Sequence, residues 1–412
     1  MLKNHPPSLK WLSIVGIGED GVSGLGDAAK QKIRTAEIVF GGKRHLTLAA
    51  ELIAGEARAW PSPFEHGIEA VVGLRGQKNV CVLASGDPFL HGVGATLARH
   101  VDATEMEVLP SPSALSLAAA RLGWPLHSTT TISLHGKPLD LIRPQLHPGQ
   151  RILALTSDAD GPAALALLLS ELGFGKSWLT VMEALGGSGE RITRQQASDF
   201  SLAGINPLNL VAIQVVADVD ARILSLTSGL ADDLFEHDGQ ITKREIRAAT
   251  LSALAPRRGE LLWDIGAGSG SVAIEWMLAD PSLRAVAIET DPERSARIGR
   301  NAKACGVPDL EIVRGAAPAA LAGLAAPDAI FIGGGGSDDG VLSAAIDALK
   351  PGGRLVANAV TLEMEALLLA KYRELGGGLI RITVSRANPV GSMSGWRPAM
   401  PVTQWSWVKK WS

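Results

Sequence analysis

The stretch LLWDIGAGSGSVAIEWML, residues 261–278, constrains the fold of this chain more than any other part of the sequence. Its apolar start is typical of a buried strand, and the apolar run after the loop is typical of a helix. Between them, Gly266, Gly268 and Gly270 alternate with small residues. Glycines permit a tight turn and let a ligand approach the bare backbone at the N-terminus of the helix. The stretch therefore predicts a strand–loop–helix unit of a nucleotide-type α/β fold.

The chain is long enough for more than one domain. Its 412 residues exceed one ordinary domain, and 46% apolar residues supply material for buried cores. Strand-like runs alternate with helical ones over residues 11–217, and a second series of alternation surrounds residues 261–278. We therefore predict two α/β domains without an internal repeat, at residues 1–219 and 235–412, joined by a polar linker at 220–234.

Charge and cysteine content exclude several classes of protein. The formal net charge is −3, without a dense block of Lys and Arg, so the chain has no general attraction for nucleic acid. Cys81 and Cys305 are isolated and make neither a disulfide framework nor a zinc site, and no metal is expected. Pro6 and Pro7 interrupt the region where a signal peptide would be apolar, and no apolar run reaches the ~18 residues of a membrane span. The sequence predicts a cytoplasmic protein without a membrane partner.

Two acidic residues around the glycine loop distinguish between nucleotide cofactors. A dinucleotide fingerprint is G-x-G-x-x-G, whereas this loop is G-x-G-x-G with Asp264 two residues before its first glycine. A carboxylate there repels a pyrophosphate but suits the ammonium group of S-adenosylmethionine. Glu289 ends the next predicted strand, where it can accept both hydroxyls of a ribose. With the helix–turn–strand sequence at residues 349–363, this half resembles a class I methyltransferase that uses S-adenosylmethionine. The alternatives are a dinucleotide site or a loop that serves only as a turn.

The loop after the fourth predicted strand of this half indicates the kind of substrate. Amino-group methyltransferases that act on bases often carry Asn/Asp-Pro-Pro-aromatic there, whereas this chain has four glycines at residues 333–336. Glycines offer no side-chain amide or base, but they let a broad, flat substrate approach the methyl donor. We interpret the loop as the floor of a site for a conjugated macrocycle that is methylated at carbon. The alternative is a flexible surface loop.

Three stretches of the first half together resemble the tetrapyrrole, or class III, methyltransferases: IVGIG at residues 14–18, ASGDPFLHG at 84–92 and PSPSALSLAAARLGWP at 110–125. The resemblance implies two α/β lobes with S-adenosylmethionine folded in the cleft between them. The cofactor contacts that it implies are Gly16, Gly18, Gly86, Asp87, Pro88 and Ser113. His135 is a candidate substrate contact, although a structural histidine is the favoured interpretation.

A class III half followed by a class I half is an unusual order, and FEHDGQITKREIRAATLSAL precedes the second core at residues 235–254. In both features the chain resembles, over nearly its full length, the family of bifunctional precorrin C5,C15-methyltransferases (decarboxylating) of aerobic cobalamin biosynthesis. The resemblance implies methylation of precorrin-6B at C5 by the first half and at C15 by the second half. It also implies loss of the carboxylate of the ring C (C12) acetate, which gives precorrin-8X. One S-adenosylmethionine site in each half and a homo-oligomer, dimer or tetramer, are implied as well.

Carried onto this sequence, the resemblance assigns the cofactor contacts of the second half. They are Thr242, Gly266, Ala267, Gly268, Ser269, Gly270, Glu289 and Ala317. We predict Asp264, Ala316 and Gly333 as further cofactor contacts. Ala316 stands where class I enzymes commonly have an acid that contacts the adenine amine, so we expect the backbone at Ala317 to hold the adenine. Because the sulfonium methyl is already activated, the protein must mainly align the reacting atoms and exclude water. We also expect an apolar pocket around the carboxylate that is lost.

The acidic substrate that the resemblance implies would need cationic anchors. The candidates are His237, Lys243, Arg244, Arg247, Arg386 and Arg397, of which Lys243, Arg386 and Arg397 are favoured. Solvated surface charge is an equal alternative for each of them, and no catalytic acid or base is assigned. Four tryptophans are candidates for stacking on a macrocycle: Trp396, Trp405, Trp407 and Trp411. Alternation in QWSWVKKW is explained more simply by a half-buried terminal strand.

Three other functions compete with this interpretation. One is an RNA or protein methyltransferase with a non-catalytic class III appendage, which the acidic balance and the glycines at 333–336 disfavour. Another is a non-catalytic role for one half, which would bind the cofactor only to organise the other half. The third is an NAD-dependent reductase.

Overall fold

The computed structural model describes residues 10–411, which form two compact units. The first unit runs to residue 137 and continues over 147–222, and the second contains 138–146 and the chain from residue 223 onward. The sequence places 138–146 inside the predicted first domain, whereas its contacts place it in the second unit. Both units alternate strands and helices, which confirms the predicted α/β class. Within the described residues, no helix has the length and apolar character needed to cross a membrane.

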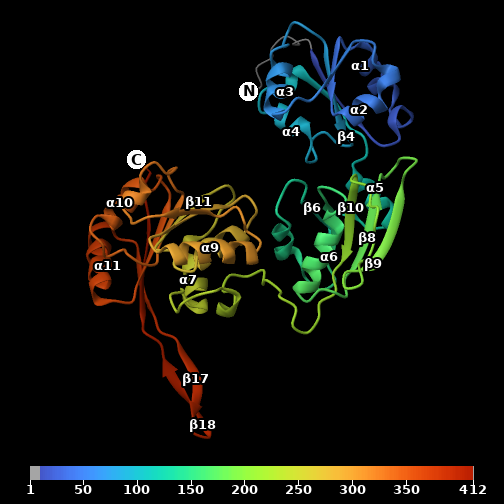
Figure 1. The fold of residues 1–412 in the computed structure, drawn as a ribbon. Coiled ribbons are helices and arrows are strands. Elements are labelled where there is room, and N and C mark those ends of the chain that lie inside the picture. Colours follow the sequence, from blue (N-terminus) through green and yellow to red (C-terminus); the bar gives the residue numbers. More distant parts are fainter. Residues whose placement is uncertain (1–9, 412) are drawn as a thin grey trace. The chain divides into compact units, whose positions relative to one another are not determined.

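The first sheet of the first unit is entirely parallel (Figure 1). Its strands are β1 (Leu12–Ile17), β2 (Ile38–Gly41), β3 (Glu56–Ala59), β4 (Val80–Ser85) and β5 (Met106–Leu109). Its helices are α1 (Asp27–Thr35), α2 (Lys43–Leu48), α3 (Phe64–Val72) and α4 (Val93–Leu97), with 3₁₀ turns η1 (Gly21–Gly24), η2 (Ala50–Leu52) and η3 (Ala103–Glu105). The strand order is β3-β2-β4-β1-β5, and Ile17 pairs with Ser85. The loops after β1 and β4 therefore leave the sheet side by side.

The second sheet of the first unit is mostly antiparallel. Its strands are β6 (Thr130–Ser133), β7 (Arg151–Leu155), β8 (Trp178–Glu183), β9 (Arg191–Gln196) and β10 (Asn209–Gln214), accompanied by α5 (Ala114–Leu122), α6 (Gly161–Glu171) and η4 (Leu126–Ser128). The order is β6-β7-β10-β8-β9, and only β6 and β7 are parallel. The ends of α5 follow from local sequence, because the Ser113 hydroxyl accepts the Ser116 amide at 3.1 Å and Gly123 follows the helix with φ of 64°.

The second unit is built on a seven-stranded sheet in the order β13-β12-β11-β14-β15-β19-β16. Its strands are β11 (Leu261–Ile265), β12 (Arg284–Glu289), β13 (Glu311–Arg314), β14 (Ala329–Ile332), β15 (Arg354–Ala359), β16 (Gly378–Ile382) and β19 (Val402–Val408). The first five strands of that order are parallel, and β19 runs antiparallel to both neighbours. Chain order reverses at β11, which lies between β12 and β14. Ligands of open α/β sheets bind outside the carboxyl ends of the strands at such a point.

Helices cover both faces of this sheet (Figure 1). They are α7 (Arg244–Leu254), α8 (Ser271–Leu278), α9 (Pro292–Ala304), α10 (Val341–Ala348) and α11 (Leu362–Leu375), with η5 (Leu139–Gln145), η6 (Asp232–Leu234) and η7 (Ala319–Leu321). One hydrophobic core joins the sheet to α7, α8 and α9 around Trp276. A second core joins it to α10 and α11 around Trp263 and Trp405. Trp405 is fully buried on β19, which confirms the predicted terminal strand, but residues 402–405 are all buried, so the strand is not half-buried as the alternation predicted.

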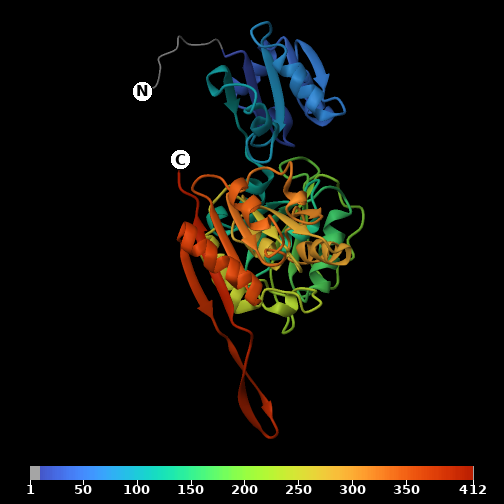
Figure 2. The ribbon, with the colours of Figure 1, turned by 90° about the vertical axis from the view of Figure 1, so that its left-hand side faces the viewer.

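A two-stranded hairpin projects from the second unit, as Figures 1 and 2 show. It consists of β17 (Ser385–Val390) and β18 (Met393–Pro398). Trp396 is 77% exposed on this hairpin, and Val390 and Met393 are exposed as well. The hairpin therefore presents apolar side chains outside both cores of the unit.

Candidate functional site

The loop between β11 and α8 forms a backbone cradle. Gly266, Gly268 and Gly270 have φ values of 69°, 59° and 74°, in the left-handed region that favours glycine. A β-carbon at Gly266 would meet the carbonyl group of Gly334. The loop therefore requires glycine for its conformation, and Gly266 is also needed for the close approach of the loop after β14.

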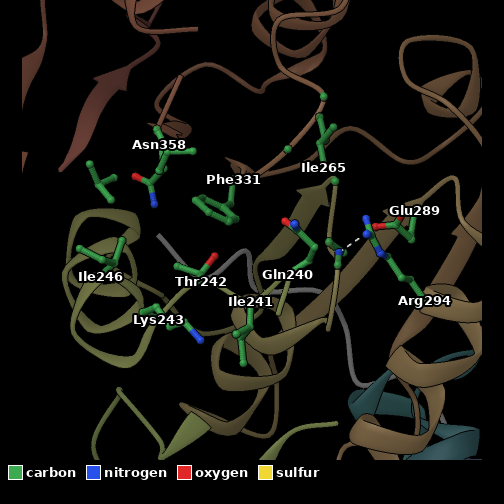
Figure 3. Close-up of a pocket in the computed structure, with 18 of the residues that line it drawn as sticks. Gln240, Ile241, Thr242, Lys243, Ile246, Ile265, Glu289, Arg294, Phe331 and Asn358 are labelled. Carbon is green, nitrogen blue, oxygen red and sulfur yellow. Dashed lines mark hydrogen bonds between the residues drawn. The ribbon is translucent and has the colours of Figure 1, made fainter. Parts of the chain in front are cut away.

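Glu289 supplies the acidic side of this cradle. It ends β12, its side chain is buried, and its carboxylate accepts the Gly268 amide at 2.8 Å and the Asp291 amide at 3.1 Å. Glu289 and Arg294 lie at the same end of the cavity in Figure 3. Each carboxylate oxygen can accept more than one hydrogen bond, so Glu289 retains acceptor capacity for the hydroxyls of a ribose.

Asp264 lies behind the loop and does not line the cavity. Its side chain is 1% exposed, and Oδ2 accepts the Ala273 amide of α8 at 3.1 Å. Oδ1 has no hydrogen-bond partner among the described residues. Burial, together with the nearby negative charge of Glu289, raises the pKa of Asp264 to about 7. In this structure Asp264 fixes the first turn of α8, while the predicted contact with the cofactor ammonium stays a prediction.

A cavity of about 520 Å³ opens in front of the cradle (Figure 3). The predicted cofactor contacts that line it are Thr242, Gly266, Ala267, Gly268, Glu289, Ala316, Ala317 and Gly333. Ser269 and Gly270, like Asp264, are outside this lining. Apolar side chains, including Ile241, Ile246 and Phe331, make up much of the wall. The cavity thus combines an acid, bare backbone and an apolar surface, which fits the ribose, the methionine part and the adenine of S-adenosylmethionine.

Only some of the predicted cationic anchors line the cavity. Lys243 and Arg386 line the cavity, and Arg386 forms an ion pair with Glu245, which also lines it. His237, Arg244 and Arg397 do not line it. The lining also lacks all four tryptophans that were candidates for stacking on the substrate, which are Trp396, Trp405, Trp407 and Trp411.

Arg247 was predicted as a candidate anchor for the substrate, and the structure contradicts this prediction. Its side chain is fully buried between α7 and α8, where it forms ion pairs with Glu275 at 2.5 Å and Asp232 at 3.1 Å. The guanidinium also lies 4.9 Å from the centroid of the Phe235 ring. A charge enclosed in this way holds the fold together and is not available to a substrate.

The first unit has a cavity of about 560 Å³ that is lined from both of its sheets. The predicted residues that line it are Gly18, Gly86, Ser113 and His135. Gly16, Asp87 and Pro88 do not line it. Gly16 is needed for packing, because a β-carbon added there would meet the Gly86 carbonyl oxygen. The Asp87 carboxylate accepts the Phe89 amide at 2.8 Å within the turn. His135 Nδ1 lies 3.3 Å from the Thr156 carbonyl oxygen, so the ring has a structural partner at the cavity wall.

Sequence reasoning missed a polar cluster in this first cavity. Arg44 forms an ion pair with Glu19 and donates to the Ser85 hydroxyl at 3.0 Å, and His45 Nε2 lies 2.9 Å from the same hydroxyl. Burial, and then the charge of Arg44, lowers the pKa of His45 to about 4. The sequence did carry a signal, since IVFGGKRH at residues 38–45 places three basic residues two positions after an apolar run.

Two family models match the chain. The model described as tetrapyrrole (corrin/porphyrin) methylases matches residues 12–201, and the precorrin methyltransferase domain matches residues 233–409. A precorrin-6Y C(5,15)-methyltransferase (decarboxylating) of a Sinorhizobium species is 63% identical over 410 residues, which cover 99% of each chain. This chain belongs to the precorrin-6Y C(5,15)-methyltransferase family. The Mycobacterium tuberculosis protein of that name is 44% identical over 403 residues, covering 96% of this chain and 99% of its own.

Membership of the precorrin-6Y C(5,15)-methyltransferase family makes the chain a methyltransferase whose methyl donor is S-adenosylmethionine. The predicted architecture is confirmed, with a tetrapyrrole methylase half followed by a class I-like half. A shorter relative, the cobalt-precorrin-6B C(15)-methyltransferase (decarboxylating) of Salmonella typhimurium, is 36% identical over 184 residues. That match covers 42% of this chain and 92% of the Salmonella protein.

Proposed function

We propose that this enzyme methylates a precorrin twice and decarboxylates it once, converting precorrin-6B to precorrin-8X in cobalamin biosynthesis. The first half, residues 1–219, acts at C5. The second half, residues 235–412, acts at C15 and removes the carboxyl group of the ring C acetate, with 220–234 as the linker. The observation that carries this proposal is the pair of cavities, each beside a glycine turn, in two halves that match different methylase models. The Salmonella relative, whose name combines C15 methylation with decarboxylation, supports the assignment of both to one half.

Each half holds its own S-adenosylmethionine in this proposal. In the second half, Glu289 accepts the ribose hydroxyls, and Ala316 and Ala317 face the adenine. Thr242 and the backbone of residues 266–270 surround the methionine part, with Gly333 near the methyl group. In the first half, Gly18, Gly86 and Ser113 form the corresponding wall, and Gly16, Asp87 and Pro88 shape the turn behind it.

The residues of the second cavity orient the ring and exclude water. S-adenosylmethionine supplies a methyl group that is already activated by its sulfonium. The glycines after β14 leave room for a flat macrocycle, and Phe331 and Ile246 keep the space beside it apolar. Lys243 and Arg386 lie where they can hold carboxylates of the substrate through charge-assisted hydrogen bonds. Alignment in a dry site contributes to the rate without a protein acid or base, and none is assigned here.

We further propose a homo-oligomer, dimer or tetramer, in the cytoplasm. The exposed apolar side chains of the β17–β18 hairpin, Val390, Met393 and Trp396, support burial of this hairpin in an assembly. Analytical ultracentrifugation tests this proposal, and a species with the mass of one chain at micromolar concentration would contradict it.

Two alanine substitutions test the division of labour in the full chain. Gly86 and Gly266 both have positive φ, and a β-carbon at either one would collide with neighbouring backbone. Gly86→Ala and Gly266→Ala are therefore expected to disable the first and second sites respectively. Gly123→Ala and Gly259→Ala are matched controls, because these glycines also have positive φ but have open space around the β-carbon.

Mass spectrometry of the product of precorrin-6B is the measurement. The wild type and both controls should add two methyl groups and remove one carboxyl group. Gly86→Ala should lose one methyl transfer and keep the decarboxylation, whereas Gly266→Ala should lose one methyl transfer together with the decarboxylation. Retention of both methyl groups by either site variant, or decarboxylation by Gly266→Ala, would contradict the proposal.

A further inference from the structure

Asn358 lies near the carboxyl end of β15 and lines the cavity of the second unit, on the same side as Phe331 in Figure 3. Two buried residues fix its side chain. Gln404 Nε2 donates to Asn358 Oδ1 at 2.9 Å, and Asn358 Nδ2 donates to Thr250 Oγ1 at 2.9 Å. Gln404 Nε2 also donates to Thr250 Oγ1 at 3.1 Å. Gln404 is 2% exposed and Thr250 is fully buried, so solvent does not reach these two members of the network.

The network determines which way the Asn358 amide points. Both hydrogens of Gln404 Nε2 are used, one on Asn358 Oδ1 and one on Thr250 Oγ1. Turning the Asn358 amide over would set its NH₂ group against that of Gln404, donor against donor. An asparagine amide nitrogen carries two hydrogens, and Thr250 takes one of them. Among the described residues the second hydrogen has no acceptor, so Asn358 offers one N–H donor in the cavity wall.

This donor lies on the substrate side of the site. Glu289 ends β12 and marks the ribose position, and β11 and β14 separate β12 from β15. Three steps between neighbouring strands place β15 about 14 Å from β12. Asn358 is therefore remote from the adenosine end and close to Phe331 (Figure 3). Because Ile332 pairs with Ala357, the glycine loop after β14 leaves the sheet beside Asn358.

We infer that Asn358 donates its free N–H to the acetate carboxylate that the second half removes. The inference rests on the proposed function and adds a specificity-determining residue to it. A single neutral donor orients a carboxylate but leaves its negative charge in place. An arginine in the same position would neutralise that charge. Three cations line the cavity, and each has an acidic partner: Lys243 pairs with Asp232, Arg294 with Asp238 and Arg386 with Glu245. Ile246 and Phe331 supply apolar surface in the same lining, and an apolar surrounding disfavours a carboxylate more than the neutral carbon dioxide that leaves.

The chemical step that Asn358 serves is balanced without a further reactant from the protein. The bond between the acetate methylene and its carboxyl carbon breaks, and carbon dioxide leaves. The electron pair of that bond passes into the conjugated ring system. A proton from water then converts the methylene to a methyl group. Asn358 fixes the plane of the carboxylate so that the breaking bond aligns with the ring orbitals.

Asn358→Asp is the sharpest test, because aspartate keeps the shape and the acceptor for Gln404. It replaces the NH₂ group, which supplies both the free donor and the hydrogen bond to Thr250, by a second oxygen. Asn388→Asp, on the β17 strand outside the cavity lining, is the matched control. Full-length proteins are incubated with precorrin-6B and S-adenosylmethionine, and released carbon dioxide and product mass are followed. We expect Asn358→Asp to decarboxylate on the order of 100-fold more slowly, a loss typical of removing a hydrogen bond to a charged group. Its affinity for S-adenosylmethionine and its melting temperature should match those of Asn388→Asp.

A second variant keeps the inference testable if Asn358→Asp is unstable. Thr250→Val removes the acceptor that fixes the Asn358 amide, and we expect about a tenfold slower decarboxylation with unchanged cofactor affinity. Decarboxylation at the wild-type rate by Asn358→Asp, or an equal loss of cofactor binding, would overturn the role of Asn358. A wild-type enzyme that releases no carbon dioxide would instead overturn the proposed function, so the two failures are distinguishable.

Discussion

Arg247 of α7 and Glu275 of α8 form a buried ion pair, with 2.5 Å between Arg247 Nε and Glu275 Oε1. Arg247 also donates to the Thr242 carbonyl oxygen at 2.5 Å. The Glu275 carboxylate accepts the Gly229 amide at 2.6 Å and the Leu230 amide at 2.9 Å. The pair therefore ties the chain before α7, including Thr242 at the cavity wall, to the core of the second unit.

Removing one member of this pair should be costly. Arg247→Met leaves the Glu275 carboxylate buried without its cation, and such a loss typically destabilises a fold by about 3–5 kcal/mol. Because Thr242 loses its anchor, the affinity for S-adenosylmethionine should fall as well. Arg258→Met is the control, since Arg258 pairs with Asp280 at an exposed position and should contribute less than about 1 kcal/mol. Urea denaturation measures both effects, and equal destabilisation by the two variants would contradict the role of the pair.

Asp264 predicts a pH dependence of stability in the cofactor-free protein. Burial raises its folded-state pKa to about 7, whereas an unfolded aspartate has a pKa of about 3.9. Between these values the folded state keeps a proton that the unfolded state has lost, so the free energy of unfolding declines as pH rises. Below about 3.9 and above about 7 this group adds no slope.

Asp264→Asn removes this titration but keeps an oxygen that can accept the Ala273 amide. Its free energy of unfolding should decline less than that of the wild type as pH rises toward about 7. Urea denaturation at a series of pH values in that interval is the measurement. Parallel curves for the wild type and Asp264→Asn would show that the titration belongs to another group.

Lys243 and Arg386 should contribute to binding of the acidic substrate. Removing either charge by substitution to alanine is expected to raise KM for the precorrin about tenfold, the effect of losing one hydrogen bond to a charged group. The effect should shrink at high salt, because both side chains are partly exposed. Arg373→Ala, at an exposed position on α11, is the control. An unchanged KM in both cavity variants would remove these residues from the substrate site.

Much of the second unit follows from local sequence. The glycine spacing and the apolar runs predict β11, its loop and α8, and Asp291, Pro292 and Gly306 predict the limits of α9. These features are determined by residues close to one another in the chain, because turns and caps need particular backbone angles and particular side-chain acceptors. Glu289 was identified in the same way, since a residue that ends a parallel strand beside the glycine loop must face it.

Side chains that meet only through tertiary packing could not be identified. Asn358 and Gln404 come from neighbouring antiparallel strands, and Thr250 comes from a helix more than a hundred residues earlier in the chain. Arg247 looks like the other basic residues of its helix, and only the position of Glu275 on α8 explains its burial. Such pairings depend on which helix covers which face of the sheet, and a local pattern does not carry that information.

The central claim is that each half of this chain holds its own methyl donor. Isothermal titration of the full-length protein with S-adenosylmethionine tests it most directly. We predict two molecules bound per chain, falling to one in Gly86→Ala and to one in Gly266→Ala, with two retained in Gly123→Ala and Gly259→Ala. A wild-type chain that saturates with a single molecule would contradict the account.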